Sequence, residues 1–545
     1  MTAWRPRHGA ALAALVLVAL ALLLPFHGYL TDDTFIHLQF AKHLIRGEGF
    51  SFNAGEPTYG ATSPLWVLLL AGTGALVPGA GSTPATAAGT PPLAVIAKIY
   101  GAIFTALAVL LMAALARAVG WEPPWALAAA LLVAFHAWSA RWGISGMETP
   151  LALALTALAL LLLSRALVLG RSVVPAGLAV GAGFLARPEL LLFFVIALAM
   201  VLAGTPARTR ARRAALFAAA AVVAAGPWLA VAWTWFHRLL PNTSAAKAGA
   251  WIEPGRALSA LRESIRTVLA ADLIPAAIAV AALAWLRPWR AMGESCGRRA
   301  FWMTALLWPL LLVLSFMAEG VQVVSRYLVP AIPAFALLGL AALRLAARDW
   351  PAKRRARALA AALVLFAAQN LVVTFAVSAP HARRHTQGLR DSLAALGLWA
   401  RAKTPAGTLF AVPDIGAFGY YSDRPVLDLY GLVTPAMAGP AVHAGYDAIV
   451  WNLLFEPVGR PPYLIDRDPR EARLAPPDDP STPYRFLFSR TIPDLGITRP
   501  IPYVYSVYAI DWVRYDRMHP VTAAAPAAAE APGARPRLMR EAKLR

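Results

Sequence analysis

Two adjacent carboxylates, Asp32 and Asp33, follow the first apolar run of the sequence and are the residues best suited to chemistry. Only 14% of the residues are charged, and acids beside a membrane segment are costly unless they serve a function. A carboxylate in apolar surroundings has a raised proton affinity, and a second one nearby raises it further. The pair could supply a general base and a carboxylate that orients a hydroxyl group or holds a cation. The structural alternative is a helix start, with Thr31 as the cap and both acids at the positive end of the helix.

Three cations could hold an anionic group near this pair. Arg187 lies between two apolar runs, Arg326 opens another run, and Lys247 lies in a polar loop. All three would reach the outer face of the membrane, against the usual charge bias of outer loops. A phosphate at the membrane surface would explain them together. The structural alternatives are an ion pair for Arg187 and an interfacial anchor for Arg326.

Other polar residues in the same regions are candidate contacts to a polar substrate. They are His37, Glu56, Tyr59, Thr62, Ser63, Glu148, Glu189, Asn242, Tyr327 and Asp414. Part of this set also has a structural explanation. The loop around Tyr59 can be a Gly/Pro turn that returns the chain to the membrane, and Glu148 can begin a helix with Pro150 in its first turn.

Long apolar runs must position these residues, because 59% of the 545 residues are hydrophobic. Runs near the length of about 20 residues that spans a bilayer recur through the first two-thirds of the chain, which predicts an all-α polytopic membrane protein. The candidate spans are 9–26, 64–78, 93–114, 124–139, 150–168, 173–187, 189–204, 214–236, 268–286, 300–318, 327–346 and 358–378. The first lacks a clear cleavage site and is expected to remain as a span.

The distribution of basic residues orients these spans. Clusters at 208–213, 287–299 and 348–357 mark cytoplasmic loops, and Arg5 and Arg7 place the N-terminus inside. The segment after residue 378 then lies outside, which requires an odd number of crossings and predicts 11 or 13. The net charge of +21 follows from this topology and from anionic lipid, so we expect no nucleic acid partner. The single Cys296 excludes an intrachain disulfide framework.

Two regions are expected outside the bilayer that the 1–378 membrane domain spans. The first is the loop 27–63, in which Asp33, Ile36, His37, Phe40 and Leu44 follow helical spacing and predict a short helix along the membrane surface. The second is a small extracytoplasmic α/β domain at 379–520, with strands at 408–412 and 425–429. The Ala/Pro-rich and then basic tail 521–545 is expected to be disordered.

The motifs resemble, in type and order, the bacterial C-type membrane glycosyltransferases that use polyprenyl-phosphate sugars. The resemblance is to the group around the mycobacterial terminal arabinofuranosyltransferase, within a superfamily that includes protein mannosyltransferases and aminoarabinose transferases. The motifs are Asp32-Asp33-Thr-Phe-Ile-His-Leu, Gly55-Glu56-Pro57 through Thr62-Ser63-Pro64-Leu-Trp66, Gly146-Met147-Glu148-Thr149-Pro150, Arg187-Pro188-Glu189, Pro241-Asn242-Thr243, Lys247-Ala-Gly249, Arg326-Tyr327-Leu, Asp414-Ile-Gly416-Ala-Phe-Gly419-Tyr420-Tyr421 and Asp428-Leu-Tyr-Gly431-Leu.

This resemblance implies the C-type glycosyltransferase fold and an inverting transfer of a hexosyl or pentosyl group. The sugar would move from a polyprenyl-phosphate donor to a glycan, lipid or protein acceptor of the cell envelope, as in polysaccharide biosynthesis, at the outer face of the bacterial cytoplasmic membrane. Either Asp32 or Asp33 would be the base, with Asp32 preferred. Mg²⁺ or Ca²⁺ could take part, although two carboxylates alone do not establish a metal site. The chain departs from the family pattern at Phe35, at Tyr59-Gly60 and after Thr243.

Two other classes of protein are compatible with the composition. A transporter or flippase of a lipid-linked sugar would have helices interrupted at the midplane and an internal symmetry, neither of which is visible in the sequence. A catalytically inactive relative that serves as a scaffold would keep the same motifs. Charges that gather at one face of the membrane rather than at mid-bilayer favour the enzyme.

Overall fold

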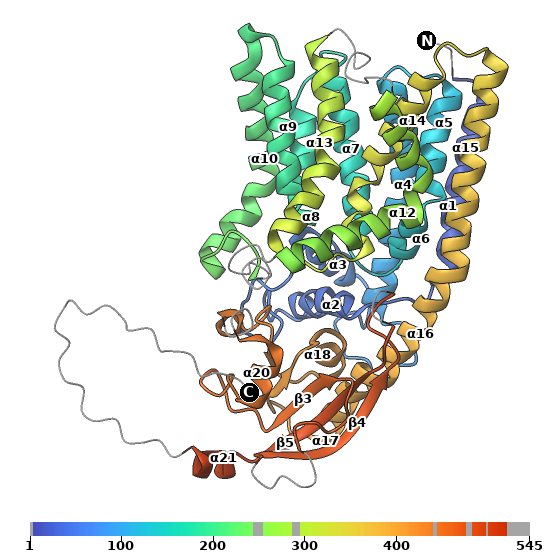
Figure 1. The fold of residues 1–545 in the computed structure, drawn as a ribbon. Helices are drawn as coiled ribbons and strands as arrows, with labels where there is room; N and C mark the ends of the chain where they lie inside the picture. The colour runs from blue at the N-terminus through green and yellow to red at the C-terminus, as the bar shows by residue number, and fades with distance from the viewer. Residues whose placement is uncertain are drawn as a thin grey trace.

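The computed structural model describes residues 4–242, 254–285, 295–439, 444–475, 482–497 and 500–519. Lys247 and the tail beyond residue 519 therefore lie outside the described residues. The chain forms a bundle of long helices, with a smaller domain of helices and one sheet below one end of it (Figure 1). A long continuous helix, Ala352–Lys403, carries the chain from the bundle into the smaller domain, so the predicted boundary at residue 378 falls inside this helix.

Apolar helices make up the bundle. They are α1 (Pro6–Leu23), α3 (Pro64–Gly74), α4 (Pro92–Ala118), α5 (Pro123–Ala134), α6 (Ala137–Gly143), α7 (Thr149–Leu167), α8 (Val174–Ala186), α9 (Leu190–Gly204), α10 (Ala207–Phe236), α12 (Pro254–Trp285), α13 (Cys296–Glu319), α14 (Ile332–Ala346) and α15 (Ala352–Val372). Many begin at a proline, which fits the first helical turn because its missing N–H has no partner there. The small residues of neighbouring helices allow close packing: a Cβ on Gly177 of α8 would lie 2.3 Å from the carbonyl oxygen of Phe217 in α10.

Seven helices of the described chain are long and apolar enough to cross a membrane, or eight if the bent pair α5 and α6 is one span. This number is smaller than the 11 or 13 crossings expected from the sequence. Three of the expected spans form short apolar helices, namely α3 with 11 residues, α8 with 13 and α9 with 15. The expected span 268–286 lies in α12, which is kinked at Asp272 and is not among the seven. The prediction of a polytopic helical membrane protein is confirmed.

The helix predicted in the loop 27–63 exists as α2 (Asp32–Ile45), but it does not lie exposed along the membrane surface. Thr31 caps it by accepting a hydrogen bond from the backbone N–H of Thr34, as the structural interpretation of the acidic pair expected. Every residue from Thr34 to His43 is buried, because α2 lies between the bundle and the C-terminal domain (Figure 1). The helix is therefore covered by protein on both sides.

The C-terminal domain contains five helices among the described residues and a five-stranded mixed sheet. Its helices are α16 (Ala379–Leu389), α17 (Ala395–Lys403), α18 (Gly416–Ser422), α20 (Gly445–Trp451) and α21 (Trp512–Met518), and its strands are β1 (Phe410–Val412), β2 (Val426–Asp428), β3 (Tyr463–Asp468), β4 (Tyr484–Ile492) and β5 (Tyr503–Ile510). The sheet order is β2-β1-β3-β5-β4. Strand β1 is parallel to both of its neighbours, β2 and β3, and the other two pairs are antiparallel. The small α/β domain and its two predicted strands are confirmed.

One hydrophobic core joins α2 to this domain. Phe35 and Phe40 of α2 belong to the same buried cluster as Phe410, Phe418 and Tyr420 of the C-terminal domain. The ring of Phe35 lies 5.4 Å from that of Tyr420, measured between centroids, a separation typical of favourable aromatic pairs. The helix that carries the acidic pair is thus packed as part of the C-terminal domain as much as of the bundle.

Candidate active site

A cavity of about 630 Å³ opens where α2 meets the helix ends of the bundle. Its polar lining is formed by Asp33, His37, Thr62, Glu148, Arg187, Glu189, Ser315, Glu319, Arg326 and Tyr327. Eight of the residues that the sequence predicted thus converge on one cavity. They are Asp33, the two cations Arg187 and Arg326, and the polar residues His37, Thr62, Glu148, Glu189 and Tyr327. The apolar side comes from α9, where Leu191 and Val195, one helical turn apart, are 43% and 56% exposed. The cavity therefore joins a polar end to an exposed apolar surface on α9.

Asp33 and Arg326 form an ion pair inside this cavity. Arg326 Nη2 donates a hydrogen bond to Asp33 Oδ2, and the Asp33 side chain remains 43% exposed. The short η3 helix (Ser325–Tyr327) is fixed by Trp142, whose indole N–H donates to Ser325 Oγ at 2.9 Å. The Arg326 guanidinium lies 5.5 Å from the Trp142 ring centroid, within cation–π range. The arginine is thus held at the cavity wall with one face against an aromatic ring.

Arg187 is held between two carboxylates. Its Nη1 donates to Glu148 Oε1 at 2.8 Å, and its Nη2 donates to Glu189 Oε1 at 3.0 Å. Arg187 and Glu148 are buried, whereas the side chain of Glu189 is 26% exposed. The chain positions them through helix ends, since Arg187 is the C-cap of α8, Glu189 precedes α9 and Glu148 precedes α7. Arg187 therefore forms the ion pairs that the structural alternative expected, and it also lines the cavity.

A glycine turn places Glu148 in the cavity. Gly146 has φ 82°, which favours glycine, and a Cβ there would lie 2.5 Å from the Thr34 side chain of α2. Thr34 Oγ1 donates to the carbonyl oxygen of Ser145 at 2.9 Å, and the Trp66 indole N–H donates to the carbonyl of Gly146 at 3.1 Å. The turn is therefore fixed against α2 and α3 immediately before Glu148.

His37 lies one helical turn after Asp33 and faces the same carboxylate cluster. Its Nε2 is 4.0 Å from Glu148 Oε2, and neither His37 ring nitrogen nor Glu148 Oε2 makes a hydrogen bond to another described residue. Burial lowers the pKa of His37, although Glu148 acts in the opposite direction. The imidazole lines the cavity and can donate or accept a hydrogen bond there.

Asp32 faces a different partner from Asp33 and is not part of the cavity lining. Its two carboxylate oxygens accept hydrogen bonds from the backbone N–H groups of Gly416 and Ala417, at 3.0 Å and 2.7 Å. Burial, reinforced by the negative charge of Asp414, raises the pKa of Asp32 to about 7, against the opposing effect of the two amides. The two acids of the sequence pair thus belong to two different environments.

Tyr59 and Ser63 are buried away from the cavity. The Tyr59 hydroxyl accepts a hydrogen bond from the Trp228 indole N–H at 2.8 Å, and its ring stacks on Phe236. Ser63 precedes α3, and its Oγ donates to the carbonyl oxygen of Leu185 at 3.5 Å. Both side chains link the loop 27–63 to the bundle and do not contact the cavity.

Three other predicted contacts also lie elsewhere. Glu56 is exposed and accepts a hydrogen bond from Asn53 Nδ2 at 3.0 Å. Asn242 is buried, and its Nδ2 donates to the carbonyl oxygen of Leu432 at 3.0 Å. Asp414 forms an ion pair with Arg467 at 2.7 Å in the C-terminal domain. Asn242 and Asp414 are thus bonded to other segments of the chain, whereas the bond of Glu56 stays within the loop 27–63.

Sequence reasoning missed Glu319, Ser315, Trp142 and Leu432. Glu319 ends the apolar run of α13, and an acid at the end of a span is a signal that could have been used. Leu432 carries no such signal, because a leucine in a loop has no chemistry that points to a cavity. Its place becomes visible only when the C-terminal domain is folded against α2.

Among the described residues that line the cavity, acidic side chains outnumber basic ones. The carboxylates of Asp33, Glu148, Glu189 and Glu319 face the guanidinium groups of Arg187 and Arg326. Among the described residues, no three His, Cys, Asp or Glu side chains gather closely enough to hold a metal ion by themselves. Mg²⁺, however, often binds one or two carboxylates together with substrate phosphates. Binding of an anionic substrate would add negative charge to the cavity, and a further cation would be needed to offset it.

The fold was compared with proteins of known structure. ArnT from Cupriavidus metallidurans, in a crystal structure with undecaprenyl phosphate, is similar over 91% of this chain and 97% of its own, with a TM-score of 0.55 and 14% identity. The oligosaccharyltransferase AglB from Archaeoglobus fulgidus, in complex with an inhibitory peptide and a dolichol-phosphate, is similar over 85% of this chain and 70% of its own, with a TM-score of 0.54 and 14% identity.

One region of the chain matches a known protein family by its sequence. Residues 380–509 match a family described as a domain of unknown function (DUF8728), and no match was found among curated proteins. The long apolar helices, the small C-terminal sheet domain and the similarity over most of the chain agree with one another. The protein is a multi-pass membrane protein with the C-type glycosyltransferase fold.

Proposed function

We propose that the protein is an inverting glycosyltransferase that moves a sugar from a polyprenyl-phosphate donor to an acceptor hydroxyl group. The cavity carries this proposal, because it joins an Arg-lined polar end to an apolar surface on α9. A polyprenyl-phosphate sugar has the matching shape, with a charged phosphate between a polar sugar and a long apolar chain. The structures of the fold neighbours ArnT and AglB contain undecaprenyl phosphate and a dolichol-phosphate, respectively, which supports the same class of donor.

The phosphate of the donor is proposed to bind Arg326 and Arg187. Arginine pairs with phosphate oxygens through parallel N–H donors, and both guanidinium groups face the cavity. In the absence of a donor, Asp33 is paired with Arg326. The incoming phosphate would therefore compete with this carboxylate for the arginine. The lipid chain would then leave the cavity along Leu191 and Val195 on α9.

We propose Asp33 as the general base, and this differs from the preference for Asp32 that the sequence suggested. Of the two acids only Asp33 lines the cavity, while both oxygens of Asp32 accept backbone hydrogen bonds from α18. The acceptor oxygen would form a bond to the anomeric carbon as the bond from that carbon to the phosphate oxygen breaks. The bonding electrons leave with the polyprenyl phosphate, the hydroxyl proton passes to Asp33, and the arginines offset the developing charge.

The active site is proposed to face the outside of the cytoplasmic membrane. The basic clusters at 208–213 and 348–357 lie at or just before the first turns of α10 and α15, and Arg298 and Arg299 open α13. Each of these helices runs from its basic end toward the C-terminal domain (Figure 1). Basic residues mark the cytoplasmic side, so the C-terminal domain and the cavity would lie on the opposite, extracytoplasmic side.

We favour the enzyme over the alternative of a transporter or flippase, although the described residues include a bent helix pair, α5 and α6. The break between α5 and α6 bends the chain by 54°, as a transporter site would require. The polar groups at this break, however, are bonded to other residues of the protein. The Ala137 N–H donates to Asn370 Oδ1 at 2.8 Å, and His136 pairs with Asp272 at 3.0 Å. None of these residues lines the cavity.

The test is transfer of radiolabelled sugar from synthetic polyprenyl-phosphate hexose and pentose donors in membranes that contain the protein. We expect Asp33→Asn to lower the transfer rate by about 10² to 10⁴-fold, the usual contribution of a general base, while donor binding is retained. Asp32→Asn is the comparison variant and should keep a higher rate than Asp33→Asn. Full activity of Asp33→Asn with loss in Asp32→Asn would assign the base to Asp32. Movement of the donor across the bilayer without a new glycosidic bond would support the flippase.

A further inference from the structure

We propose that helix α18 of the C-terminal domain holds α2 at both ends, so that Asp32, Lys42 and Asp423 act as positioning residues for Asp33. This inference rests on the proposed function, in which Asp33 is the base. The α2–α18 interface is defined here by Asp32, Lys42 and Arg46 on α2 and by Gly416, Ala417 and Asp423 on or next to α18.

The first end of this interface is the bond from Asp32 to the start of α18. Both carboxylate oxygens are used, one by the Gly416 N–H and one by the Ala417 N–H. The backbones are also in direct contact, because a Cβ on Gly416 would lie 1.9 Å from the backbone oxygen of Asp32. No residue larger than glycine fits at this position without moving α18 away from α2.

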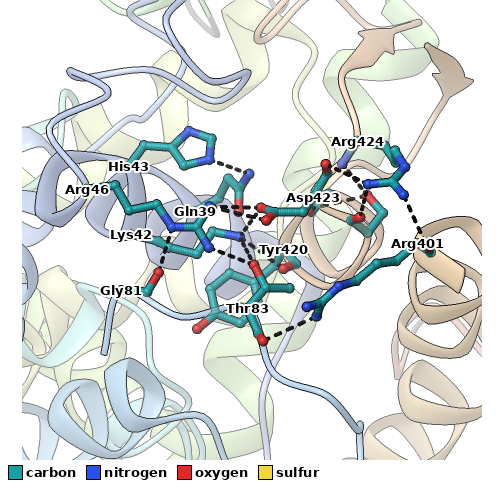
Figure 2. Close-up of polar contacts among 12 residues, drawn as sticks. Gln39, Lys42, His43, Arg46, Gly81, Thr83, Arg401, Tyr420, Asp423 and Arg424 are labelled. Atoms are coloured by element: carbon teal, nitrogen blue, oxygen red, sulfur yellow. Dashed lines mark hydrogen bonds and ion pairs between the residues drawn. The ribbon is translucent and has the colours of Figure 1, made fainter. Parts of the chain in front are cut away.

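The second end lies about three helical turns further along α2, at Lys42 and Arg46. Lys42 Nζ donates to Asp423 Oδ1 at 3.1 Å and to the carbonyl oxygen of Tyr420 at 3.1 Å. Arg46 Nη1 donates to the same Asp423 Oδ1 at 3.0 Å. Figure 2 shows that both cations point toward Asp423 at the end of α18, with Thr83 accepting hydrogen bonds beside them.

Asp423 is the residue on which this second end depends. The Lys42 side chain is fully buried, with 0% exposure, whereas Asp423 is 31% exposed. Burial lowers the pKa of Lys42 to about 8, and the charge of Asp423 opposes this shift. The two cations in turn lower the pKa of Asp423. One carboxylate thus serves two cations, and its removal would leave a buried ammonium group without its counter-charge, which is strongly unfavourable.

The two helices run side by side in the same direction, because their N-terminal ends meet at Asp32 and Gly416 and their C-terminal ends at Lys42 and Asp423. Phe35 of α2 packs between these ends against Tyr420 and Tyr421. Contacts at two ends fix both the position of α2 along its axis and its rotation about that axis.

The rotation of α2 determines where Asp33 points. Neighbouring residues of an α-helix differ by about 100° around its axis. With Asp32 fixed toward α18, Asp33 is therefore directed to the side where the cavity and Arg326 lie. Release of either end would let α2 turn or shift, and a displacement of about 1 Å at a reacting group can cost about 10²-fold in rate.

Asp423→Asn is the first test, because asparagine keeps the size of the side chain and tolerates the left-handed backbone of residue 423, where φ is 52°. We expect its kcat to fall about tenfold while the KM for the donor changes less than twofold. Hydrogen exchange in peptides that cover residues 32–45 should become faster. Asp423→Glu should restore both readouts in part. Asp516→Asn is the matched control, since it removes an exposed ion pair with Arg460 in the same domain.

Gly416→Ala tests the other end independently, with Gly439→Ala as control because a Cβ at residue 439 meets nothing within 4 Å. We expect the same pattern as for Asp423→Asn from the first variant and none from the second. Unchanged kcat with faster exchange in α2 would overturn the positioning role and leave the proposed function intact. Absence of transfer by the unaltered protein would instead overturn the proposed function, and the exchange data would still decide whether α18 holds α2.

Discussion

At the scale of single residues, Asp32 and Asp33 show how two neighbouring carboxylates acquire different properties. Asp33 pairs with a cation at the cavity wall, whereas Asp32 is enclosed by the backbone of another domain and is close to Asp414. A base that must reach an acceptor needs an open side, and a positioning group needs fixed partners. The environments of the two acids fit these two roles.

The raised pKa of Asp32 predicts a specific dependence of stability on pH. The folded state holds this proton up to a pKa of about 7, while the unfolded chain releases it near 3.8. Between these values the folded state binds more protons, so the free energy of unfolding falls as the pH rises from about 4 to about 7. The Asp32→Asn variant lacks this contribution of Asp32 to the pH dependence of the free energy of unfolding. Thermal unfolding at pH 5 and pH 7.5 should show that the advantage of the unaltered protein over the variant shrinks as the pH rises.

The surplus of carboxylates in the cavity leads to a prediction about cations. We expect EDTA to lower the transfer rate about tenfold or more and Mg²⁺ or Ca²⁺ to restore it, because a divalent ion can bridge a carboxylate and the donor phosphate. Initial rates with and without EDTA measure this. A rate that EDTA does not change would contradict the prediction and assign the missing positive charge to Lys247, in which case Lys247→Ala should weaken donor binding.

At the scale of elements, a segment of the C-terminal domain closes the cavity beside the loop 27–63. Leu432 lines the cavity, and its carbonyl oxygen accepts a hydrogen bond from Asn242 at 3.0 Å. Asp428 supports this segment by accepting backbone hydrogen bonds from Tyr430 and Val433 at 2.9 Å. The cavity therefore depends on two parts of the chain that are distant in sequence.

Gly60→Ala should disturb this closure. A Cβ at residue 60 would lie 2.7 Å from both the Leu432 carbonyl oxygen and a Val433 methyl group, so the segment 431–433 must move outward. We expect a higher KM for the donor, by about threefold to tenfold, with a smaller effect on kcat. Steady-state kinetics with the donor as the varied substrate measure both constants. Gly72→Ala is the control, because a Cβ there meets nothing within 4 Å, and an equal effect of both variants would contradict the expectation.

At the scale of the whole molecule, the single cysteine provides a test of orientation. Cys296 is exposed at the start of α13, and this helix of 24 residues ends at Glu319 in the cavity, about 35 Å away. We expect a membrane-impermeant maleimide to label Cys296 only after permeabilisation of right-side-out vesicles. A cysteine introduced by Asp516→Cys in a Cys296→Ser background should be labelled without permeabilisation. The opposite pattern would place the active site in the cytoplasm.

Much of the molecule was accessible from the sequence because lipid imposes simple rules. The apolar runs predicted the bundle, and Arg187 and Arg326 were found because charges are rare beside membrane spans. Polar type alone also selected Tyr59, Asn242 and Asp414, which make structural bonds instead. The difference between Asp32 and Asp33 could not be predicted, because it depends on a contact with residues 416 and 417 from the other end of the chain.

That contact has a consequence for how the protein is made. Asp32 and Gly416 are separated by 384 residues, so α2 emerges from the ribosome long before the helix that covers it. Until then the side of α2 that packs against α18 is uncovered, and Lys42 lacks its contacts with Tyr420 and Asp423. Newly made chains should therefore pass through a state with an assembled bundle and an uncovered α2. A chain cut short before residue 416 should remain in this state.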